Sequence, residues 1–511
     1  MEKIKTWIVN NKVEFVVLLL IVAVGAFVRL FKIDQYMTFL GDEGRDVIIV
    51  RRLLTEGHPP LIGPGTSIGS MYLGPLYYYM MAPALLLANF SPVGPAVQIA
   101  LLGIATIVLV WFAGREWFGK VAATVAALLY SISPTVIIYS RSSWNPNIMP
   151  FFALLLIYSV YRFWRKQEFK WIIVTGVAFA FTLQSHYLGL LLAPTIGVFW
   201  LLTLWKTVKD KNKKVIKSLL TKSLISAGLF LLLMSPLAIF DVRHGYINFN
   251  AIMTFFVKRE TTVSIIPWKA IPNMWPIYGD VVTRLPGGRD VTAGMILSYA
   301  LVIFIVWTLI RLKKLNPEYK FNFLLVLTWL LFGLVGLGLY KQHIYDHYYG
   351  FFFPAPFLLT GMAIAEISKS RKRIFVGLSV ILVGALVYAN SIQNPLKYPP
   401  TMQLTRAQVV SKRVVEVASG QRFNFSLIAD ANYDPGYRYF LNLMGAKVVD
   451  IDPQNADATI TDQLLVVCEK PKEKCDPTHN PKAEIAGFGW TKVESDESVF
   501  GVTLYKLVHT K

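Results

Sequence analysis

The chain is poor in charged residues for its length. Only 16% of its 511 residues are Asp, Glu, Lys or Arg, whereas 54% are hydrophobic. A water-soluble protein of this size would not normally show this balance. The composition therefore argues against an ordinary soluble enzyme and indicates an integral membrane protein.

Acidic residues are scarce relative to basic ones. The chain has 31 acidic and 51 basic residues, which gives a formal net charge of +20. Such an excess could suggest nucleic acid as a partner, but the Lys and Arg residues fall mainly in connectors between apolar runs rather than in one patch. The preference of cytoplasmic loops for positive charge explains this distribution better, and we expect no nucleic-acid partner.

Cysteine is almost absent. The chain contains only Cys468 and Cys475, both near its C-terminal end. Two cysteines cannot form a cysteine-based metal cluster. They would close a small disulfide loop if this part of the chain lies in an oxidising compartment.

Apolar runs of membrane-spanning length, about 17 to 25 residues, recur along the first three quarters of the chain. We predict eleven spans, at residues 13–30, 94–113, 121–139, 149–161, 171–185, 188–205, 223–240, 291–310, 321–340, 349–366 and 374–388. The first is read as an uncleaved span because it lacks a small-residue cleavage site. Residues 74–89 are left out, since Pro83 interrupts them and the row Tyr77, Tyr78, Tyr79 suits a helix at the membrane interface.

The basic connectors predict which side of the membrane each loop occupies. With the N-terminus in the cytoplasm, eleven spans place most Lys and Arg inside, including the lysine-rich connector 206–217. Loops 32–73 and 241–290 and the C-terminal part then lie outside. Because no eukaryotic sorting signal is apparent, we expect a multi-pass protein of a prokaryotic plasma (inner) membrane.

The last quarter of the chain has a different pattern. After about residue 390 the apolar runs shorten and charges of both signs return, so we expect domains at 1–390 and 391–511. In the domain 391–511 we predict a helix at 404–418 and strands at 425–429, 446–451, 464–468 and 499–507. The predicted fold class is mainly α, with transmembrane helices and a C-terminal α/β domain outside the cytoplasm.

The first external loop presents two adjacent acids, Asp42 and Glu43, between Gly41 and Gly44. A carboxylate beside the membrane is partly desolvated and suits a general base that activates a hydroxyl. The spacing supports a structural interpretation equally well, with Asp42 as a helix N-cap and Glu43 as an acid of the first turn. The pair is thus a candidate catalytic site that the spacing alone does not establish.

Further polar residues gather on the side that the topology places outside. Their cations could offset the negative charge of a phosphate leaving group. Each could equally be a residue at a span end that reaches the lipid headgroups. The candidate substrate-binding residues are Arg45, Tyr77, Arg141, Asn145, His186, Arg243, His244, Lys341 and His347.

A metal site is the other chemistry that these loops could offer. Asp42, Glu43, His58 and His244 provide oxygen and imidazole ligands, but they follow no fixed ligand spacing. We therefore expect no metal ligand among them, although a divalent metal is not incompatible with the residues.

The chain resembles the GT-C superfamily of membrane glycosyltransferases, in the branch of protein O-mannosyltransferases and bacterial lipid A aminoarabinose transferases. The resemblance rests on the acidic pair, on two juxtamembrane helices in the first external loop, and on the aromatic stretch Gly74-Pro75-Leu76-Tyr77-Tyr78-Tyr79. It covers about residues 13–388. It implies that Asp42 is the base, that Glu43 supports it, and that Arg243 and His244 hold the phosphate of a polyprenyl-phosphate sugar.

The sequence departs from that branch at two motifs. Leu73-Gly74-Pro75 stands where the aminoarabinose transferases have Glu-Lys-Pro, and Gln184-Ser185-His186-Tyr187 stands where relatives often have a Thr-Lys-Gly turn. The donor and the acceptor could therefore both differ from those of that branch, and a phosphate-binding role for His186 rests on position alone.

The resemblance implies an inverting glycosyltransferase that moves a sugar from a polyprenyl-phosphate donor to a lipid, glycan or protein acceptor at the outer face. A transporter or flippase of lipid-linked or small solutes is the main alternative. It would predict internal repeats and charged residues in mid-membrane, and neither is apparent. A non-catalytic scaffold or receptor is the third interpretation.

Overall fold

The computed structural model describes residues 2–66, 71–257, 262–370 and 372–510. The contacts divide the chain into two compact units, each assembled from separate stretches of sequence. The helical unit comprises Met1–Phe31, Pro59–Met81 and Pro95–Pro399. The loop and tail unit comprises Lys32–His58, Ala82–Gly94 and Pro400–Lys511. This division differs from the single cut at residue 390 that the sequence predicts.

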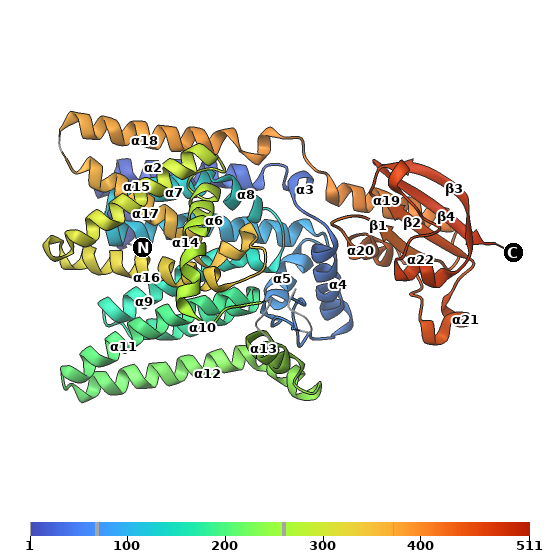
Figure 1. Cartoon of the computed structure of the whole chain (residues 1–511), viewed down its shortest axis with the longest axis horizontal. Helices are drawn as coiled ribbons and strands as arrows, with labels where there is room; N and C mark the ends of the chain where they lie inside the picture. Colours follow the sequence, from blue (N-terminus) through green and yellow to red (C-terminus); the bar gives the residue numbers. More distant parts are fainter. Residues whose placement is uncertain (1, 67–70, 258–261, 371, 511) are drawn as a thin grey trace. The chain divides into compact units, whose positions relative to one another are not determined.

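The helical unit consists of long helices that lie side by side (Figure 1). Its α-helices are α1 (Glu2–Asn10), α2 (Lys12–Leu30), α6 (Val93–Phe118), α7 (Lys120–Ile132), α8 (Pro134–Tyr139), α9 (Met149–Arg165), α10 (Lys170–Ser185), α11 (Ala193–Lys209), α12 (Lys213–Arg243), α13 (Ile247–Val257), α14 (Ile271–Arg284), α15 (Val291–Ile310), α16 (Pro317–Leu339), α17 (Pro354–Ser368) and α18 (Arg373–Ile392). Short 3-10 helices are η1 (Asn145–Ile148), η2 (Tyr187–Leu192), η3 (Pro267–Ala270), η4 (Leu312–Lys314), η5 (Asp346–Phe352) and η6 (Pro395–Lys397). Helix α5 (Leu76–Leu87) begins in this unit and ends in the other, and α6 has its first two residues, Val93 and Gly94, in the other unit.

The chain is a multi-pass membrane protein. In the described part of the chain, eight helices are long and apolar enough to span a membrane, and the bent pair η5 and α17 would make a ninth span. These nine correspond to nine of the eleven predicted spans. The other two, 121–139 and 171–185, contain α7 with 13 residues and α10 with 16, which are shorter than the roughly 20 residues that cross a bilayer.

Two predicted spans are broken rather than continuous. Ser133 is extended between α7 and α8, and Phe353 lies at the 64° bend between η5 and α17. A proline follows each of them, Pro134 and Pro354, and begins the next helix. A proline has no amide hydrogen to continue the preceding helix and is favoured at the first position of a new one.

Small residues allow close packing in the helical unit. Helix α7 is rich in buried alanines, among them Ala122 and Ala126, and packs against α17. At Gly361 of α17 an added Cβ would lie 2.3 Å from the carbonyl oxygen of Ala122. Association of helices in a membrane depends on such close backbone approach because burial from water contributes little there.

The loop and tail unit combines helices with a four-stranded sheet. Its helices are α3 (Ile33–Tyr36), α4 (Gly41–Glu56), α19 (Gln403–Ala418), α20 (Pro435–Leu443), α21 (Ala456–Thr459) and α22 (Ala483–Phe488), with the 3-10 helices η7 (Pro453–Asn455) and η8 (Lys472–Lys474). Its strands are β1 (Asn424–Ile428), β2 (Gln463–Cys468), β3 (Thr491–Val499) and β4 (Val502–His509), in the order β1-β2-β4-β3. Strands β1 and β2 are parallel, whereas β4 is antiparallel to both β2 and β3.

Most predicted elements of the tail are present. The predicted helix 404–418 is α19, and three predicted strands correspond to β1, β2 and β4. The predicted strand 446–451 is wrong, because this segment forms a single bridge between Val448 and Phe423. Strand β3 was not predicted, because it is mostly exposed and polar and therefore lacks an apolar alternation.

The segment Lys32–His58, which follows α2, folds together with the tail. Helix α4 packs on α20, and α3 packs on α19. The Phe39 ring lies 5.6 Å from that of Phe440 and 6.5 Å from that of Tyr439, measured between centroids. The segment that carries Asp42 is therefore part of the same compact unit as the C-terminal sheet.

Candidate active site

The acids Asp42 and Glu43 lie in the first turn of α4. The N-cap residue is Leu40, so the interpretation of Asp42 as an N-cap is wrong. Glu43 is a first-turn acid, as the structural interpretation proposed, and its Oε2 accepts a hydrogen bond from the Leu40 amide at 3.0 Å. Glu43 thus satisfies an amide at the helix start, as the acid of a capping box does.

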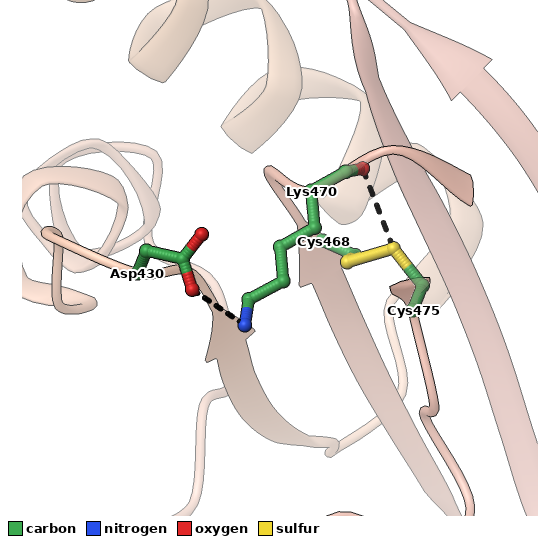
Figure 2. The surroundings of a disulfide bond; sticks show 4 residues. All are labelled: Asp430, Cys468, Lys470 and Cys475. Carbon is green, nitrogen blue, oxygen red and sulfur yellow. Dashed lines mark hydrogen bonds and ion pairs between the residues drawn. A yellow bond between two sulfur atoms is a disulfide. The ribbon is translucent and has the colours of Figure 1, made fainter. Parts of the chain in front are cut away.

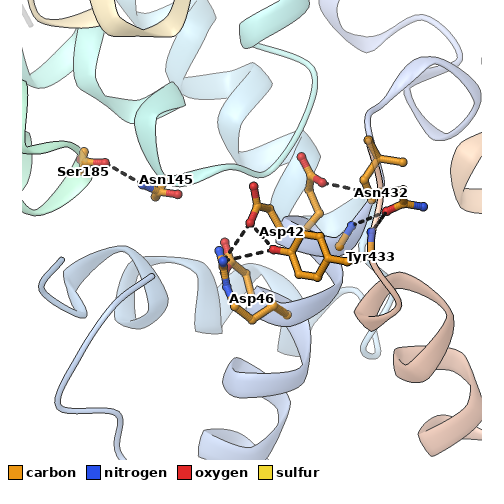
Figure 3. A network of polar contacts seen from close by, with 10 residues as sticks. Asp42, Asp46, Asn145, Ser185, Asn432 and Tyr433 are labelled. Atoms are coloured by element: carbon orange, nitrogen blue, oxygen red, sulfur yellow. Dashed lines mark hydrogen bonds and ion pairs between the residues drawn. The ribbon is translucent and has the colours of Figure 1, made fainter. Parts of the chain in front are cut away.

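Asp42 is 38% exposed and is held through one of its two carboxylate oxygens. Its Oδ1 accepts hydrogen bonds from the Tyr433 hydroxyl and, at 2.8 Å, from Arg45. Figure 3 shows the side chains of Asp42 and Tyr433 pointing toward each other. Among the described residues no donor contacts Oδ2, so this oxygen can accept a hydrogen bond from a ligand.

Arg45 connects the acids of α4. It donates to Oδ1 of Asp46 at 2.7 and 3.0 Å, and to Asp42 and the Tyr433 oxygen at 2.8 and 3.3 Å. Asp46 is fully buried, so the arginine compensates a carboxylate that has lost its hydration. Arg45 was predicted to bind substrate, and the structure gives it an ion-pair role within the unit.

The carboxylates of Asp42 and Glu43 lie in different electrostatic environments. Burial raises the pKa of Glu43 to about 7, and the negative charges of Asp42 and Asp46 act in the same direction. Backbone hydrogen bonds oppose this shift. Burial and the hydrogen bond to Asp42 raise the pKa of Tyr433 well above its usual range, so the phenol stays protonated and remains a donor.

Several predicted residues of the helical unit form a second polar group. The Tyr77 hydroxyl lies 2.6 Å from that of Ser143, and Asn145 Nδ2 donates to the Ser185 carbonyl at 2.6 Å. Figure 3 shows the contact between Asn145 and Ser185. Chain continuity from Ser143 to Asn145 and from Ser185 to His186 therefore brings Tyr77, Asn145 and His186 into one group.

Histidine and aromatic rings complete this second group. The His186 ring lies 5.9 Å from that of His347 and 4.7 Å from that of Tyr348, and His347 lies 4.5 Å from Trp144. Burial, and secondarily the charge of His347, lower the pKa of His186 to about 3. Its Nδ1 accepts from the Leu188 amide at 3.2 Å. The neutral ring therefore carries its proton on Nε2 and can donate a hydrogen bond, but it supplies no positive charge near neutral pH.

Arg141 is buried near the end of α2. Its guanidinium donates to the carbonyl of Phe31 at 2.7 Å and to that of Val28. A cation is favourable at the C-terminus of a helix, where carbonyl groups lack partners within the helix. These contacts account for the burial of Arg141 without a ligand, so its predicted phosphate contact stays a prediction.

The other predicted cations occupy exposed positions. Arg243 ends α12, and His244 follows it with its ring stacked on Phe240 at 4.0 Å. The Lys341 side chain is exposed, and its backbone amide donates to Thr262. Their exposure is compatible with either of the predicted roles, in phosphate binding or at the lipid headgroups.

Sequence reasoning missed Tyr433 and Asn432 of the tail. Their contacts with Asp42 and Gly41 join residues that are 391 positions apart. No motif or periodicity near either residue could have indicated them. In the described ranges, no group of three or more His, Cys, Asp or Glu residues is placed to hold a metal ion.

A family model and a curated relative that this chain matches are both described as mannosyltransferases. A family model described as dolichyl-phosphate-mannose-protein mannosyltransferase matches residues 73–240. The chain is also 25% identical over 131 residues to the "Putative mannosyltransferase YkcB" of Bacillus subtilis (strain 168). That match covers 25% of this chain and 18% of the relative, so the chain spans only about a fifth of that protein's length.

Two solved structures are similar over most of the chain. ArnT from Cupriavidus metallidurans, bound to undecaprenyl phosphate, has a TM-score of 0.60 at 12% identity and covers 96% of this chain and 97% of its own. The archaeal oligosaccharyltransferase AglB from Archaeoglobus fulgidus, in complex with an inhibitory peptide and a dolichol-phosphate, has a TM-score of 0.53 at 12% identity, covering 90% of this chain and 70% of its own. The chain therefore shares its fold with these two structures, and its residues 73–240 match the mannosyltransferase family model.

Proposed function

We propose that the chain is an inverting glycosyltransferase that moves a sugar from a polyprenyl-phosphate donor to a hydroxyl group of a lipid, glycan or protein acceptor. The proposal rests on the hydrogen bonding of the Asp42 carboxylate. One of its oxygens is fixed by Arg45 and Tyr433, and the other has no donor among the described residues. A positioned and accessible carboxylate oxygen is what a general base requires.

In the proposed reaction Asp42 accepts the proton of the acceptor hydroxyl. The acceptor oxygen forms a bond to the anomeric carbon on the face opposite the phosphate. The bond between that carbon and the phosphate oxygen breaks, and polyprenyl phosphate leaves with the electron pair. The exposed cations Arg243 and Lys341 are the proposed partners of the departing phosphate.

Three observations support a lipid-linked donor. The matching family model is described by dolichyl-phosphate-mannose, and the two similar structures contain undecaprenyl phosphate and a dolichol-phosphate. In the helical unit an apolar cavity of about 730 Å³ lies between α15, α17 and α18. Leu297, Leu301 and Phe304 are among its lining residues, a surface that suits an isoprenoid chain.

Two observations support reaction at the outer face of a prokaryotic plasma membrane, with the N-terminus in the cytoplasm. The first is the concentration of basic residues in alternate connectors. The second is the disulfide between Cys468 and Cys475. Such bonds persist in oxidising compartments and are rare in the cytoplasm. Asp42 belongs to the compact unit that carries this disulfide and would share its side.

The test compares the wild type with Asp42→Asn in vesicles that contain the purified chain. Radiolabelled undecaprenyl-phosphate mannose is the donor probe, and membranes from cells lacking the gene supply the acceptor. Transfer should fall about 100-fold or more, as expected for loss of a general base. Asp34→Asn is the matched control, because Asp34 is an exposed acid of the neighbouring helix α3.

Transfer by Asp42→Asn at a rate near that of the wild type would overturn the assignment of the base. Uptake of a labelled solute by the same vesicles, without transfer from any polyprenyl-phosphate sugar, would instead support the transporter alternative.

A further inference from the structure

The start of α4 is shaped to receive a tail residue. The Tyr433 ring lies against Gly41, where an added Cβ would come within 2.4 Å of the ring. The Gly41 amide donates to Asn432 Oδ1 at 2.9 Å. At Gly44 an added Cβ would lie 2.3 Å from the amide nitrogen of Gly436. Only glycine fits at these two positions, so the glycines beside the acidic pair are explained by the close approach of the tail.

The segment that carries Tyr433 is anchored through Asn432. Asn432 Nδ2 donates to Glu469 Oε1 at 2.9 Å, and the Tyr437 hydroxyl donates to the same oxygen at 2.6 Å. The Tyr433 amide donates to Asn432 Oδ1 at 2.8 Å. Asn432 therefore bonds at once to Glu469, to Gly41 and to the backbone of Tyr433.

The disulfide loop supplies these anchors. Cys468 ends β2, and Glu469 and Lys470 follow it within the loop that the bond to Cys475 closes. Lys470 pairs with Asp430 at 2.6 Å (Figure 2). The loop thus contacts the segment 430–433 at two points, Lys470 with Asp430 and Glu469 with Asn432.

We infer that Tyr433 is a positioning residue for Asp42, and that the loop closed by Cys468 and Cys475 holds Tyr433 in place. The Tyr433 hydroxyl and Arg45 converge on Oδ1 of Asp42, which directs Oδ2 toward an acceptor. The tail is thereby part of the machinery of transfer rather than an independent binding module. This inference rests on the proposed role of Asp42.

The inference predicts a specific kinetic signature. Tyr433 touches the base and not the donor, so Tyr433→Phe should lower kcat about tenfold and leave KM for the donor unchanged. The phenyl ring keeps its contact with Gly41, and the fold should therefore be preserved. Tyr439→Phe is the matched control, because it removes a tail hydroxyl that donates to the Phe90 carbonyl, and its kcat should stay within twofold of the wild type.

A double-mutant cycle tests whether Tyr433 acts through Asp42. In an Asp42→Asn background, Tyr433→Phe should cause no further loss of the residual transfer. Equal fold losses in both backgrounds would overturn the inference, as would a kcat of Tyr433→Phe equal to that of the wild type. The proposed function fails separately, if Asp42→Asn alone retains transfer.

The anchoring role of the loop has its own test. Lys470→Ala removes the contact with Asp430 without opening the disulfide, and Cys468→Ser combined with Cys475→Ser removes the disulfide. Both should lower kcat several-fold in the wild-type background and cause little further loss in Tyr433→Phe. A full kcat in both variants would overturn the anchoring role. Lys474→Ala, in the same loop, is the matched control because Lys474 is exposed and its side chain makes no ion pair with any described residue.

Discussion

The carboxylates of Asp42 and Glu43, adjacent in sequence, occupy opposite environments. Asp42 is 38% exposed and is held through Oδ1 by groups from α4 and the tail, whereas Glu43 is 5% exposed and bonds to the Leu40 amide. The pair is therefore not two equivalent acids. The carboxylate of Asp42 is partly accessible, and that of Glu43 stabilises the start of the helix that carries both.

Glu43 should make stability depend on pH. Its pKa is about 4.5 in an unfolded chain and about 7 in the folded one. Between these values the folded chain keeps a proton that the unfolded chain has released, so the free energy of unfolding falls as pH rises. Across this range the free energy of unfolding falls by about 3 kcal/mol in total. Below the lower value and above the higher one, this contribution is constant.

Glu43→Gln should remove that dependence. From about pH 4 to pH 8 the wild type should lose about 3 kcal/mol more unfolding free energy than the variant. Denaturant unfolding in detergent at the two pH values measures the difference. Glu473→Gln, at an exposed position of the tail, should behave as the wild type. Parallel pH profiles of the wild type and Glu43→Gln would contradict the burial of an ionisable Glu43.

Asn145 should be important for stability as well as for the second polar group. It is buried, and its donation to the Ser185 carbonyl fixes the end of α10 just before His186. Asn145→Ala should cost about 1 to 3 kcal/mol because it leaves that carbonyl without its donor. Asn250→Ala, which removes an exposed contact with Gly245, should change stability by less than about 0.5 kcal/mol. Equal unfolding midpoints for the two variants would exclude this role.

His186 should act without a positive charge. Because burial lowers its pKa to about 3, the ring is neutral throughout the range from about pH 5 to pH 8. His186→Gln keeps an amide donor and should leave the shape of the pH profile of transfer unchanged, even if the rate falls. His479→Gln, at an exposed histidine of the tail, serves as the control. An acidic limb that disappears only in His186→Gln would indicate that the charged imidazolium is active.

The cysteines offer a direct test of the orientation of the tail. They are the only cysteines of the chain and form a disulfide. On intact cells an impermeant maleimide should label them only after reduction, if the tail is outside. Lys211→Cys in a chain with both native cysteines replaced by serine is the counterpart, since connector 206–217 is predicted to be cytoplasmic. Its labelling should require permeabilised cells, and the reverse pattern would invert the topology.

Sequence patterns predicted the helices of the membrane part because apolar run length directly reflects bilayer thickness. They failed at Pro134 and Pro354, where an apolar run continues but the backbone cannot. The edge strand β3 was missed for the opposite reason, since backbone pairing with β4 holds it and its side chains carry no apolar pattern.

The candidate site was predictable only in part. The acidic pair and the residues Asn145 and His186 could be singled out as candidates because each lies at a span end or in a loop that the predicted topology places outside. The partner of Asp42 was not, since a contact between positions 42 and 433 depends on the tertiary fold alone. A local pattern can suggest a base, but it cannot identify the distant group that holds it.

The division of the chain into two units also determines when, during synthesis, the segment of Asp42 can fold. Residues Lys32–His58 leave the ribosome early, but the tail on which they fold is made only after every predicted span. The segment that carries Asp42 therefore stays without its contacts to the tail while the helices insert into the membrane. The proposed base would reach its working geometry only once Tyr433 has been synthesised and has folded against α4, so a nascent chain without its tail would be inactive.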